Sequence, residues 1–437
     1  MRTTLKHSLK NSEIFKTQLL HWAQQFDDIV WLDSNNYPQN LPVLNGVEIS
    51  NFDAILAVEA FTGITTDYYN AFENLKEYQT ITKDWIFGYL SYDLKNDVEN
   101  LHSKNFDGLK LPELYFFQPK KLFLLKDNNV ELHYLNCVDD TLDSDFKDIS
   151  LNKAITFKVS EPVKIKLRTH KEAYFKKLDK VLDHIQRGDI YEANFCQEFY
   201  AENKVINPLT IYNKLNKISK PPFATFLKQG KNYLMSASPE RYLKKSGHSI
   251  VSQPIKGTAK RSLDSNYDLI LKNNLVKNKK ERSENIMIVD LVRNDLSLTA
   301  KKGSVTVKEL CKVYTFPQVH QMISTITSEI DITTHPVDVI KTTFPMGSMT
   351  GAPKISAMKI IEDLEDTKRG LYSGAVGYFT PEGDFDFNVV IRSIIYNASK
   401  KYVSYSVGSA ITAKSDPLKE YEECLIKAKA MREVLEN

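Results

Sequence analysis

One acid and one lysine lie on either side of a predicted hairpin, and together they could perform nucleophilic chemistry. Glu240 belongs to Ser-Pro-Glu-Arg at 238–241, and Lys256 belongs to Pro-Ile-Lys-Gly-Thr at 254–258. An amine flanked by Ile and Gly can be partly desolvated, which lowers a lysine pKa from about 10.4 and frees the nitrogen to attack. Glu240 is then a candidate general acid or base. The competing reading of Lys256 is a solvated strand-end lysine, and the many other lysines of the chain favour it.

Glutamates at two places could hold a hard cation. Glu281 and Glu284 lie in one predicted helical stretch, while Glu420, Glu422 and Glu423 lie on the predicted last helix. Mg²⁺ takes one or two protein carboxylates and completes its shell with water and substrate oxygens, so one glutamate from each helix would suffice. Glu423 and Lys427 are also spaced for a surface ion pair worth about 0.2–0.5 kcal/mol, and taken alone this explanation is the better one.

Small residues, arginines and one histidine give weaker signals. The segment 347–354, Gly-Ser-Met-Thr-Gly-Ala-Pro-Lys, would let backbone N–H groups approach an anion, although a tight turn before a helix explains it equally well. Four of the ten arginines fall within 241–293 and Arg392 lies beyond them. Their planar guanidinium groups suit carboxylates, so the grouping points weakly to an anionic small molecule. His320, taken alone, is better explained as a structural residue.

Composition excludes several classes of function. The 58 Lys and Arg against 55 Asp and Glu leave a net charge of +3, with both signs interspersed, so nucleic-acid binding is set aside. No apolar run approaches the roughly 18 residues that cross a membrane, and the basic N-terminus is not followed by an apolar signal region, so we expect a cytoplasmic protein. The four scattered cysteines are interpreted as buried small residues.

Hydrophobic patterns predict the elements that position these residues. Helical spacing begins at Tyr174 and ends at Gly188, and the last helix has Asp416 as its cap with Pro417 in its first turn. The apolar face of that last helix is expected to comprise Leu418, Tyr421, Leu425, Ala428 and Met431. Further helices are predicted at 266–291, with one break, and at 336–342. Strands are predicted at 52–61, 85–92, 114–117, 121–125, 195–200, 224–227 and 233–237.

Strands and helices mix without a regular βαβ rhythm, which favours an α+β fold over a doubly wound parallel sheet. The polar stretch 139–161 is the predicted joint between an N-terminal region, 1–150, and a motif-rich region, 151–437. We expect the two regions to pack as one compact unit.

The order of the motifs resembles the signature of the chorismate-utilising enzymes. Three of its motifs are the segments around Glu240, around Lys256 and at 347–354, described above. The other two are Arg-Ser-Glu-Asn at 282–285 with Val-Asp-Leu-Val-Arg-Asn-Asp at 289–295, and Glu-Tyr-Glu-Glu at 420–423. The resemblance is strong from Tyr174 onward and weaker at 52–57 and 87–93, where the N-terminal region resembles that of anthranilate synthase component I. It implies a large two-sheet, mainly antiparallel β-sandwich with helices packed outside.

The resemblance also implies roles for individual residues. Lys256 would attack C2 of chorismate as the C4 hydroxyl leaves, and Glu240 would move protons at the departing and incoming groups. Glu284 and Glu423 would hold Mg²⁺ against the ring carboxylate. The other positions that match the active site of the family, by substrate binding or catalysis, are Thr258, His320, Thr350, Arg392, Gly408 and Lys427.

Lys256 separates the branches of this family. The lysine resembles the branch that forms 4-amino-4-deoxychorismate, a precursor of p-aminobenzoate and folate, whereas the anthranilate-forming branch usually has Ala there and carries Leu-Leu-Glu-Ser, which is missing here. Anthranilate formation remains the alternative activity, and isochorismate formation is less favoured. A non-catalytic chorismate-binding paralogue is a further alternative, because Gly408-Ser409-Ala410 replaces three glycines of the family and Lys414 replaces an Asp.

Amination requires a source of ammonia. None of the four cysteines is flanked by glycines in the Gly-x-Cys-x-Gly pattern that hydrolyses glutamine. The resemblance therefore implies that a separate glutamine amidotransferase subunit supplies ammonia.

Overall fold

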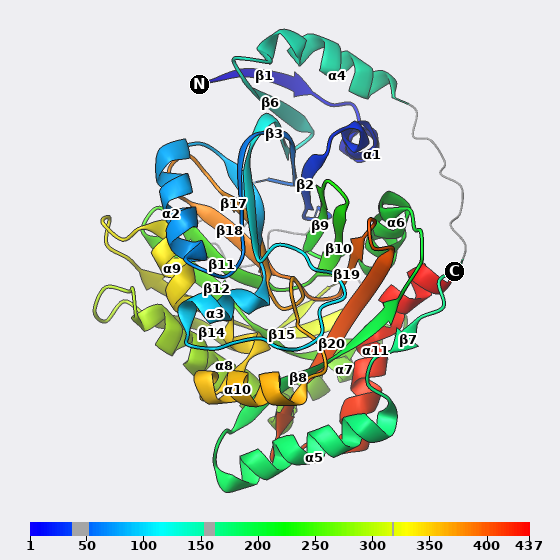
Figure 1. Cartoon of the computed structure of the whole chain (residues 1–437), viewed down its shortest axis with the longest axis vertical. Helices are drawn as coiled ribbons and strands as arrows, with labels where there is room; N and C mark the ends of the chain where they lie inside the picture. Colours follow the sequence, from blue (N-terminus) through cyan, green and yellow to red (C-terminus); the bar gives the residue numbers. More distant parts are fainter. Residues whose placement is uncertain (37–51, 153–161, 317–318) are drawn as a thin grey trace.

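The fold is a large antiparallel β-structure with helices on its outside (Figure 1), described by a computed structural model for residues 1–36, 52–152, 162–316 and 319–437. Within these residues, hydrogen bonds join twenty strands into one network, and every pairing between named strands is antiparallel. Two large apolar clusters form the interior. The predicted α+β class, with a mainly antiparallel sandwich and outer helices, is confirmed.

The bounds of the elements are as follows. The strands are β1 Arg2–Ser8, β2 Asp28–Asp33, β3 Ala54–Thr66, β4 Ile86–Leu90, β5 Leu114–Lys126, β6 Asn129–Leu135, β7 Lys166–Leu167, β8 Glu192–Ala201, β9 Phe223–Gln229, β10 Asn232–Ser238, β11 Arg241–Ser246, β12 Ser249–Gln253, β13 Ile255–Lys260, β14 Thr306–Thr315, β15 Val319–Glu329, β16 Gly351–Ala352, β17 Ala375–Phe379, β18 Phe385–Val389, β19 Ser393–Asn397 and β20 Tyr402–Thr412. The helices are α1 Ser12–Trp22, α2 Ala71–Thr82, α3 Lys95–Val98, α4 Leu142–Leu151, α5 Lys171–Arg187, α6 Pro208–Ser219, α7 Ser265–Lys277, α8 Lys279–Ser297, α9 Pro336–Thr343, α10 Lys354–Leu364 and α11 Pro417–Glu436.

Strands from the two predicted regions pair directly with each other. β2 lies between β3 and β9, and β4 lies between β5 and β17. The predicted joint contains α4, which packs against α1 at one end of the molecule (Figure 1), while residues 153–161 lie outside the described part. The sheet therefore runs through both regions, and the division near residue 150 stays a prediction.

Several predicted helix boundaries are confirmed by their caps. α5 ends at Gly188, whose φ of 83° lies in the left-handed region that favours glycine. The predicted break in the long helix is Asn278, whose side chain accepts hydrogen bonds from the backbone N–H groups of Lys280 and Glu281 and so begins α8. Asp416 caps α11 by accepting from the backbone of Lys419.

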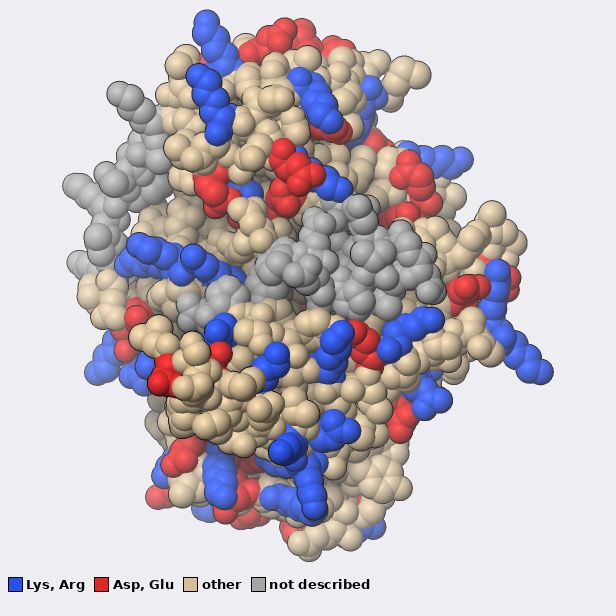
Figure 2. Space-filling view, turned by 180° about the vertical axis from the view of Figure 1, so that it is seen from behind, with Lys and Arg blue, Asp and Glu red and all other residues tan. Residues whose placement is uncertain are grey.

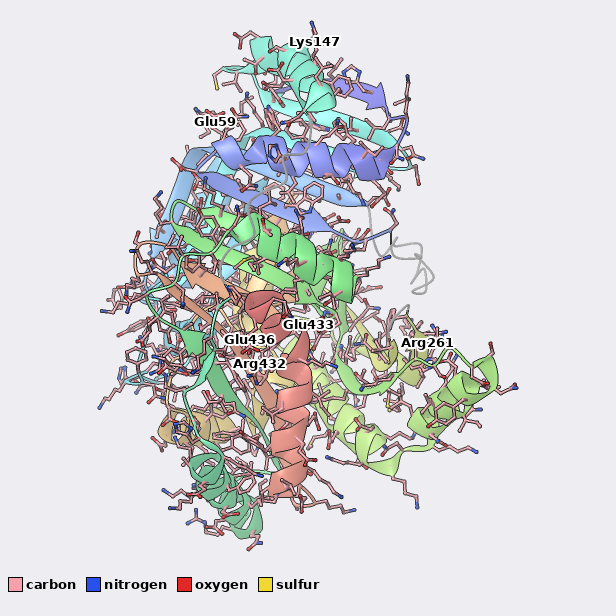
Figure 3. All side chains as sticks on the ribbon, turned by 90° about the vertical axis from the view of Figure 1, so that its right-hand side faces the viewer. Glu59, Lys147, Arg261, Arg432, Glu433 and Glu436 are labelled. Carbon is pink, nitrogen blue, oxygen red and sulfur yellow. The ribbon has the colours of Figure 1, made fainter. Side chains whose placement is uncertain are left out.

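The predicted apolar face of α11 is partly wrong. Leu418 and Leu425 are 45% and 36% exposed, whereas Glu420 and Cys424 are buried. The reason is that α11 contacts α5, α6 and β20 together, which rotates its buried stripe toward Cys424. Figure 3 shows this helix from the side, with Arg432 and Glu436 near its C-terminal end, where they form an ion pair of 2.9 Å.

Other expectations need correction. The two strands predicted at 114–117 and 121–125 form the single strand β5, because the ladder with β3 continues past Pro119 through an irregular register. Cys137 is exposed, although the other three cysteines are buried. Several lysines are buried and not solvated; among them, Lys16, Lys95 and Lys121 lie beside carboxylates.

The distribution of charge on the visible surface agrees with the mixed charges of the sequence. In Figure 2, basic and acidic side chains are interspersed over the visible face without a continuous stripe of one sign. Within the described residues, we find no helix with the length and apolar character that a bilayer crossing requires.

Candidate active site

A bulge in β13 presents the Lys256 side chain. The register between β13 and β15 shifts between Ile255 and Thr258, and Gly257 between them has φ of 93°. Such bulges often re-aim a side chain beside an active site. The amine of Lys256 lies 3.3 Å from a carboxylate oxygen of Glu192 on β8, and the side chain is 12% exposed. Lys256 is therefore a nearly buried, ion-paired lysine and not a solvated one.

The expected effect of burial on Lys256 is reversed by its neighbours. Desolvation alone lowers the pKa of the amine, but the negative charges of Glu192, Glu284 and Glu240 together outweigh it, so the pKa of Lys256 is raised. The sequence prediction of a lowered pKa is wrong, because the charges of these three carboxylates act on the amine, with Glu192 in direct contact. Lys256 is protonated at rest, and it must lose a proton before it can act as a nucleophile.

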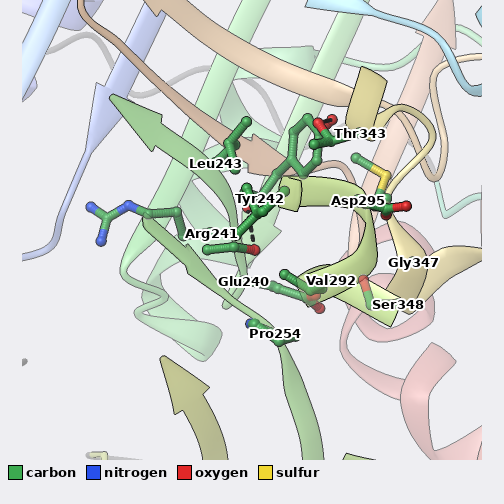
Figure 4. A pocket seen from close by; sticks show the side chains of 13 residues that line it. Glu240, Arg241, Tyr242, Leu243, Pro254, Val292, Asp295, Thr343, Gly347 and Ser348 are labelled. Atoms are coloured by element: carbon green, nitrogen blue, oxygen red, sulfur yellow. Dashed lines mark hydrogen bonds between the residues drawn. The ribbon is translucent and has the colours of Figure 1, made fainter. Parts of the chain in front are cut away.

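Glu240 lies in the short connection between β10 and β11 and is 5% exposed. Burial raises the pKa of its carboxyl to about 7, although Ser348 and the charge of Lys256 oppose the rise. Figure 4 shows Glu240 with Ser348, Asp295 and Thr343 around a cavity of about 20 Å³, which is room for about one water molecule. A carboxyl with this pKa can both donate and accept a proton near neutral pH.

Two glutamates from different helices share one lysine beside this site. The amine of Lys280 lies 3.2 Å from a carboxylate oxygen of Glu420 and 3.8 Å from Oε1 of Glu284. Glu284 Oε1 and Glu420 Oε2 are buried, and neither forms a hydrogen bond within the described residues. Burial raises the pKa of Glu284 to about 7, against the charges of Lys256 and Lys280.

A second cationic group lies where α11 meets β20. Lys427 is 2.6 Å from Glu423 and donates a 2.9 Å hydrogen bond to the carbonyl oxygen of Gly408. Arg392 donates to the carbonyl oxygen of Lys427 at 3.3 Å, and its φ of 53° is left-handed, a strained conformation that clusters at functional sites. Despite the opposing effect of burial, Lys427 holds the pKa of Glu423 below its usual value.

The donor set fits a hard cation. The charges of Lys256, Lys280 and Lys427 all act on Glu423, so α8 and α11 place Glu284 and Glu423 near one cluster of cations. The orphaned oxygens of Glu284 and Glu420 are hard ligands of the kind that Mg²⁺ prefers. No three His, Cys, Asp or Glu side chains of the described chain already form a metal-binding group. Magnesium binding by Glu284 and Glu423, with Glu420 beside them, stays a prediction.

Replacing Glu284 tests this prediction. In Glu284→Gln, the Mg²⁺ concentration that gives half-maximal activity should rise about tenfold or more, because a charged oxygen ligand is lost. Asp290→Asn is the matched control, since Asp290 lies on the same helix but pairs on the surface with Arg293. The measurement is initial rate against free Mg²⁺ for the three proteins. An unchanged Mg²⁺ dependence in Glu284→Gln would remove this residue from the metal site.

Of three other predicted site residues, His320 and Thr350 are buried, whereas Thr258 is exposed. His320 is buried on β15, where its ring nitrogens lie 3.1 Å from Asp268 and 3.1 Å from Thr315. Thr350 is buried, and its hydroxyl donates to backbone carbonyls of the 346–347 turn. Thr258 is exposed on β13. The structure places Thr258 near Lys256 in the same strand, but both nitrogens of His320 already have partners.

The 347–354 segment does not offer Lys354 as a free cation. Lys354 pairs with buried Asp295 at 2.6 Å and donates to the carbonyl oxygen of Thr343. The lysine therefore joins α8 to α10 and is not available to an anion. Ser348 from the same segment instead lies against Glu240.

Two of the departures from the family pattern, at Ser409 and Lys414, lie away from the Gly408 contacts, whereas Ala410 is on the same face of β20 as Gly408. A Cβ on Gly408 would come within 2.4 Å of Cys196 Sγ, so a glycine is required at this position. Ser409 is buried and lies beside Tyr174 of α5, since successive residues of a strand face opposite sides. Lys414 is exposed in the turn before α11.

Sequence reasoning missed Glu192. It is 1% exposed at the start of β8, and its Oε2 has no hydrogen-bond partner among the described residues. The sequence did offer a signal, because Glu192 precedes the buried run Ala193–Phe199 of a strand, where an unpaired acid is costly. Its partner, Lys256, lies 64 residues away in the chain, so only the fold reveals the pair.

A family model described as chorismate binding enzyme matches residues 28–433, and the chain belongs to this family. The chain is 40% identical over 273 residues to the aminodeoxychorismate synthase of Streptomyces griseus, covering 62% of this chain but only 37% of that protein. It is 30% identical over 362 residues to aminodeoxychorismate synthase component 1 of Bacillus subtilis, covering 80% of this chain and 76% of that protein.

A relative with another name is also similar over most of the chain. An anthranilate synthase component I-like protein of Synechocystis is 32% identical over 370 residues, covering 84% of this chain and 76% of that protein. Among solved structures, anthranilate synthase component I from Streptococcus pneumoniae has a TM-score of 0.79 at 23% identity, covering 91% of this chain and 95% of that one. The structural likeness confirms the fold, and the family match confirms that the chain is a chorismate-utilising enzyme.

Proposed function

We propose that this chain performs the reaction of aminodeoxychorismate synthase component I, in which chorismate and ammonia give 4-amino-4-deoxychorismate. The observation that carries the proposal is the meeting of Lys256 and Glu240 in one buried site: a nearly buried amine, and a carboxyl with a pKa of about 7 that responds to the charge of that amine. A site with an amine nucleophile and a carboxyl that exchanges protons suits displacement of a hydroxyl in two steps. Relatives named for this synthase at 30–40% identity support it.

The cations of the site suit a dianionic substrate. Arg392 has one hydrogen bond among the described residues, to a carbonyl oxygen, which leaves most of its five N–H donors for a carboxylate. Lys427 lies beside it and beside the Gly408 carbonyl. A bound Mg²⁺, held by Glu284 and Glu423, would neutralise the second carboxylate of the substrate and orient the ring.

Lys256 and Glu240 then divide the reaction between them. The amine of Lys256 forms a bond to C2 while the ring double bond shifts and the C4–O bond breaks. Glu240 protonates the departing hydroxyl, which leaves as water. Ammonia next forms the C4–N bond, the C2–N bond breaks, and Glu240 takes the surplus proton from the new amine. A carboxyl with a pKa of about 7 can act in both directions at neutral pH.

The balance of products tests the proposal. Purified protein with chorismate, Mg²⁺ and ammonium should consume chorismate without releasing pyruvate, because 4-amino-4-deoxychorismate keeps the enolpyruvyl side chain. Anthranilate has lost that side chain, so an anthranilate-forming enzyme would release one pyruvate for each chorismate. Chorismate that binds but is never consumed, even with abundant ammonium, would instead identify a non-catalytic paralogue.

The source of ammonia gives a separate prediction. Because no cysteine of the chain lies in a Gly-x-Cys-x-Gly motif, ammonium should support activity while glutamine alone should not. Adding a glutamine amidotransferase subunit should make glutamine effective. Initial rates with ammonium, with glutamine, and with glutamine plus that subunit give the comparison. Full activity with glutamine and this chain alone would exclude dependence on a separate subunit.

A further inference from the structure

Glu192 is a buried acid that has no part in the steps proposed for Lys256 and Glu240. Its carboxylate is 1% exposed and lies 3.3 Å from the Lys256 amine through Oε1. Oε2 is buried and has no hydrogen-bond partner in the described part of the chain. A buried carboxylate with an unused oxygen is costly to keep, so a role in the site is a better explanation than stability alone.

The backbone fixes Glu192 in place. β8 lies between β20 and β16, where Glu192 is opposite Thr412 on one side and Ala352 on the other. Gly351 of β16 lets the strands β16 and β8 approach closely, since a Cβ there would come within 2.1 Å of the Glu192 carbonyl oxygen. The carboxylate therefore approaches Lys256 from the first residue of a strand that is paired on both sides.

The resting amine needs a proton acceptor. Of the acids whose charges act on Lys256, Glu192 is the one within ion-pair distance in the described structure; Glu240 and Glu284 also act on it, from the β10–β11 connection and from α8. The charge of Lys256 in turn reaches Glu281 of α8 and Glu423 of α11. Lys280, on α8, is engaged by Glu420.

We propose that Glu192 is the catalytic base that removes the proton from the Lys256 ammonium before the attack and returns it afterwards. This inference rests on the proposed function and deepens it. It separates the proton of the nucleophile, handled by Glu192, from the protons at C4, handled by Glu240.

The proton balance closes over one cycle. Glu192 takes one proton from Lys256, whose nitrogen lone pair then forms the C2–N bond as the C4–O bond breaks, with water leaving on a proton from Glu240. Ammonia adds at C4, the C2–N bond breaks, and its electron pair returns to the lysine nitrogen. The new C4 ammonium gives one proton back to Glu240, and Glu192 returns its proton to Lys256. The net change is chorismate plus ammonia to aminodeoxychorismate plus water.

Glu192→Gln separates a base from a merely electrostatic partner. Removing the negative charge makes the Lys256 amine easier to deprotonate, so its acetylation by acetic anhydride at pH 8, measured on the Lys256 peptide by mass spectrometry, should increase. The value of kcat/KM with ammonium should nevertheless fall about a hundredfold or more, because the base is gone. A variant with unchanged or higher kcat/KM would overturn the inference, and so would unchanged labelling of Lys256.

Glu198→Gln is the matched control. Glu198 lies on the same strand, is 7% exposed and pairs with Arg168, away from Lys256. It should leave both kcat/KM and Lys256 labelling near those of the wild-type protein. Glu192→Asp keeps a carboxylate but draws it back by one carbon, and it should fold and lose less activity than Glu192→Gln.

The wild-type protein supplies a readout that needs no variant. The pH dependence of Lys256 acetylation should show an amine that is still protonated at pH 8. An amine already free at pH 8 would need no base and would overturn the inference even if every Glu192 variant failed to fold. The labelling does not depend on which product the protein forms. A wild-type protein that forms no aminodeoxychorismate would therefore contradict the proposed function, while the labelling would still test the Lys256–Glu192 pair.

Discussion

Lys256→Ala should lose about a thousandfold or more in kcat/KM with chorismate and ammonium, since the variant removes the nucleophile that divides the substitution into two steps. The loss should appear mainly in kcat, because the variant keeps Arg392 and Lys427, which would bind the substrate, and Glu284 and Glu423, which would bind the metal. Steady-state kinetics at saturating Mg²⁺ gives the measurement.

Two further variants separate chemistry from structure at Lys256. Lys256→Arg keeps a positive charge beside Glu192 and Glu284, so the fold should be preserved, yet a guanidinium is a poor nucleophile and the activity should be as low as in Lys256→Ala. Lys260→Ala removes an exposed lysine from the same strand and should have near wild-type activity. A Lys256→Ala protein that retains full activity would exclude the covalent role.

Glu240→Gln should lose about a hundredfold to ten-thousandfold in kcat, the usual range for removal of a general acid or base. The amide has nearly the same shape but cannot exchange the proton at C4. In the wild-type protein, the pH profile of kcat/KM should contain an ionisation near 7, the pKa to which burial raises this carboxyl. That ionisation should be absent from the residual activity of the variant.

The same substitution should make stability less sensitive to pH. Glu240 binds its proton more tightly in the folded chain, with a pKa of about 7, than in the unfolded chain, where it is near 4.5. Its contribution to stability is therefore fully present below about pH 4.5 and is lost as pH rises through 7, a change of about 3 kcal/mol. Urea unfolding at pH 5 and pH 8 should show a smaller loss of stability in Glu240→Gln than in the wild-type protein.

Glu113→Gln is the control for the effects of Glu240→Gln on activity and on the pH dependence of stability. Burial, reinforced by the charge of Asp93, also raises the pKa of Glu113 to about 7, but this residue precedes β5 and accepts a hydrogen bond from Ser91, outside the site. Its substitution should reduce the pH dependence of stability in the same way and leave the activity unchanged. Equal loss of activity in both variants would mean that Glu240 acts through stability and not through proton transfer.

The parts of the fold that local chemistry determines could be predicted from the sequence. Gly188 ends α5 and Asp416 begins α11, because a left-handed glycine and a capping carboxylate act within a few residues of the chain. The buried face of α11 could not be predicted as well, since contacts with three distant elements decide it. Leu418 and Leu425 fit the helical spacing but lie toward solvent.

The site shows the same division between local and distant effects. The motifs identify Lys256, Glu240 and Glu284 as residues of interest, but the charge state of Lys256 depends on Glu192 and Glu284, which reach it from other elements. Desolvation considered alone gave the wrong direction for its pKa. The partners of His320, which are Asp268 and Thr315, are likewise set by how α7 and β14 pack on β15.

The mass of the product made from chorismate and ¹⁵N-labelled ammonium, with Mg²⁺ present, tests the central claim most directly. The account predicts a product that retains the enolpyruvyl side chain and carries one ¹⁵N in place of the C4 hydroxyl, formed by the wild-type protein and not by Lys256→Arg. A product with the mass of labelled anthranilate, formed with an equal amount of pyruvate, would contradict the account.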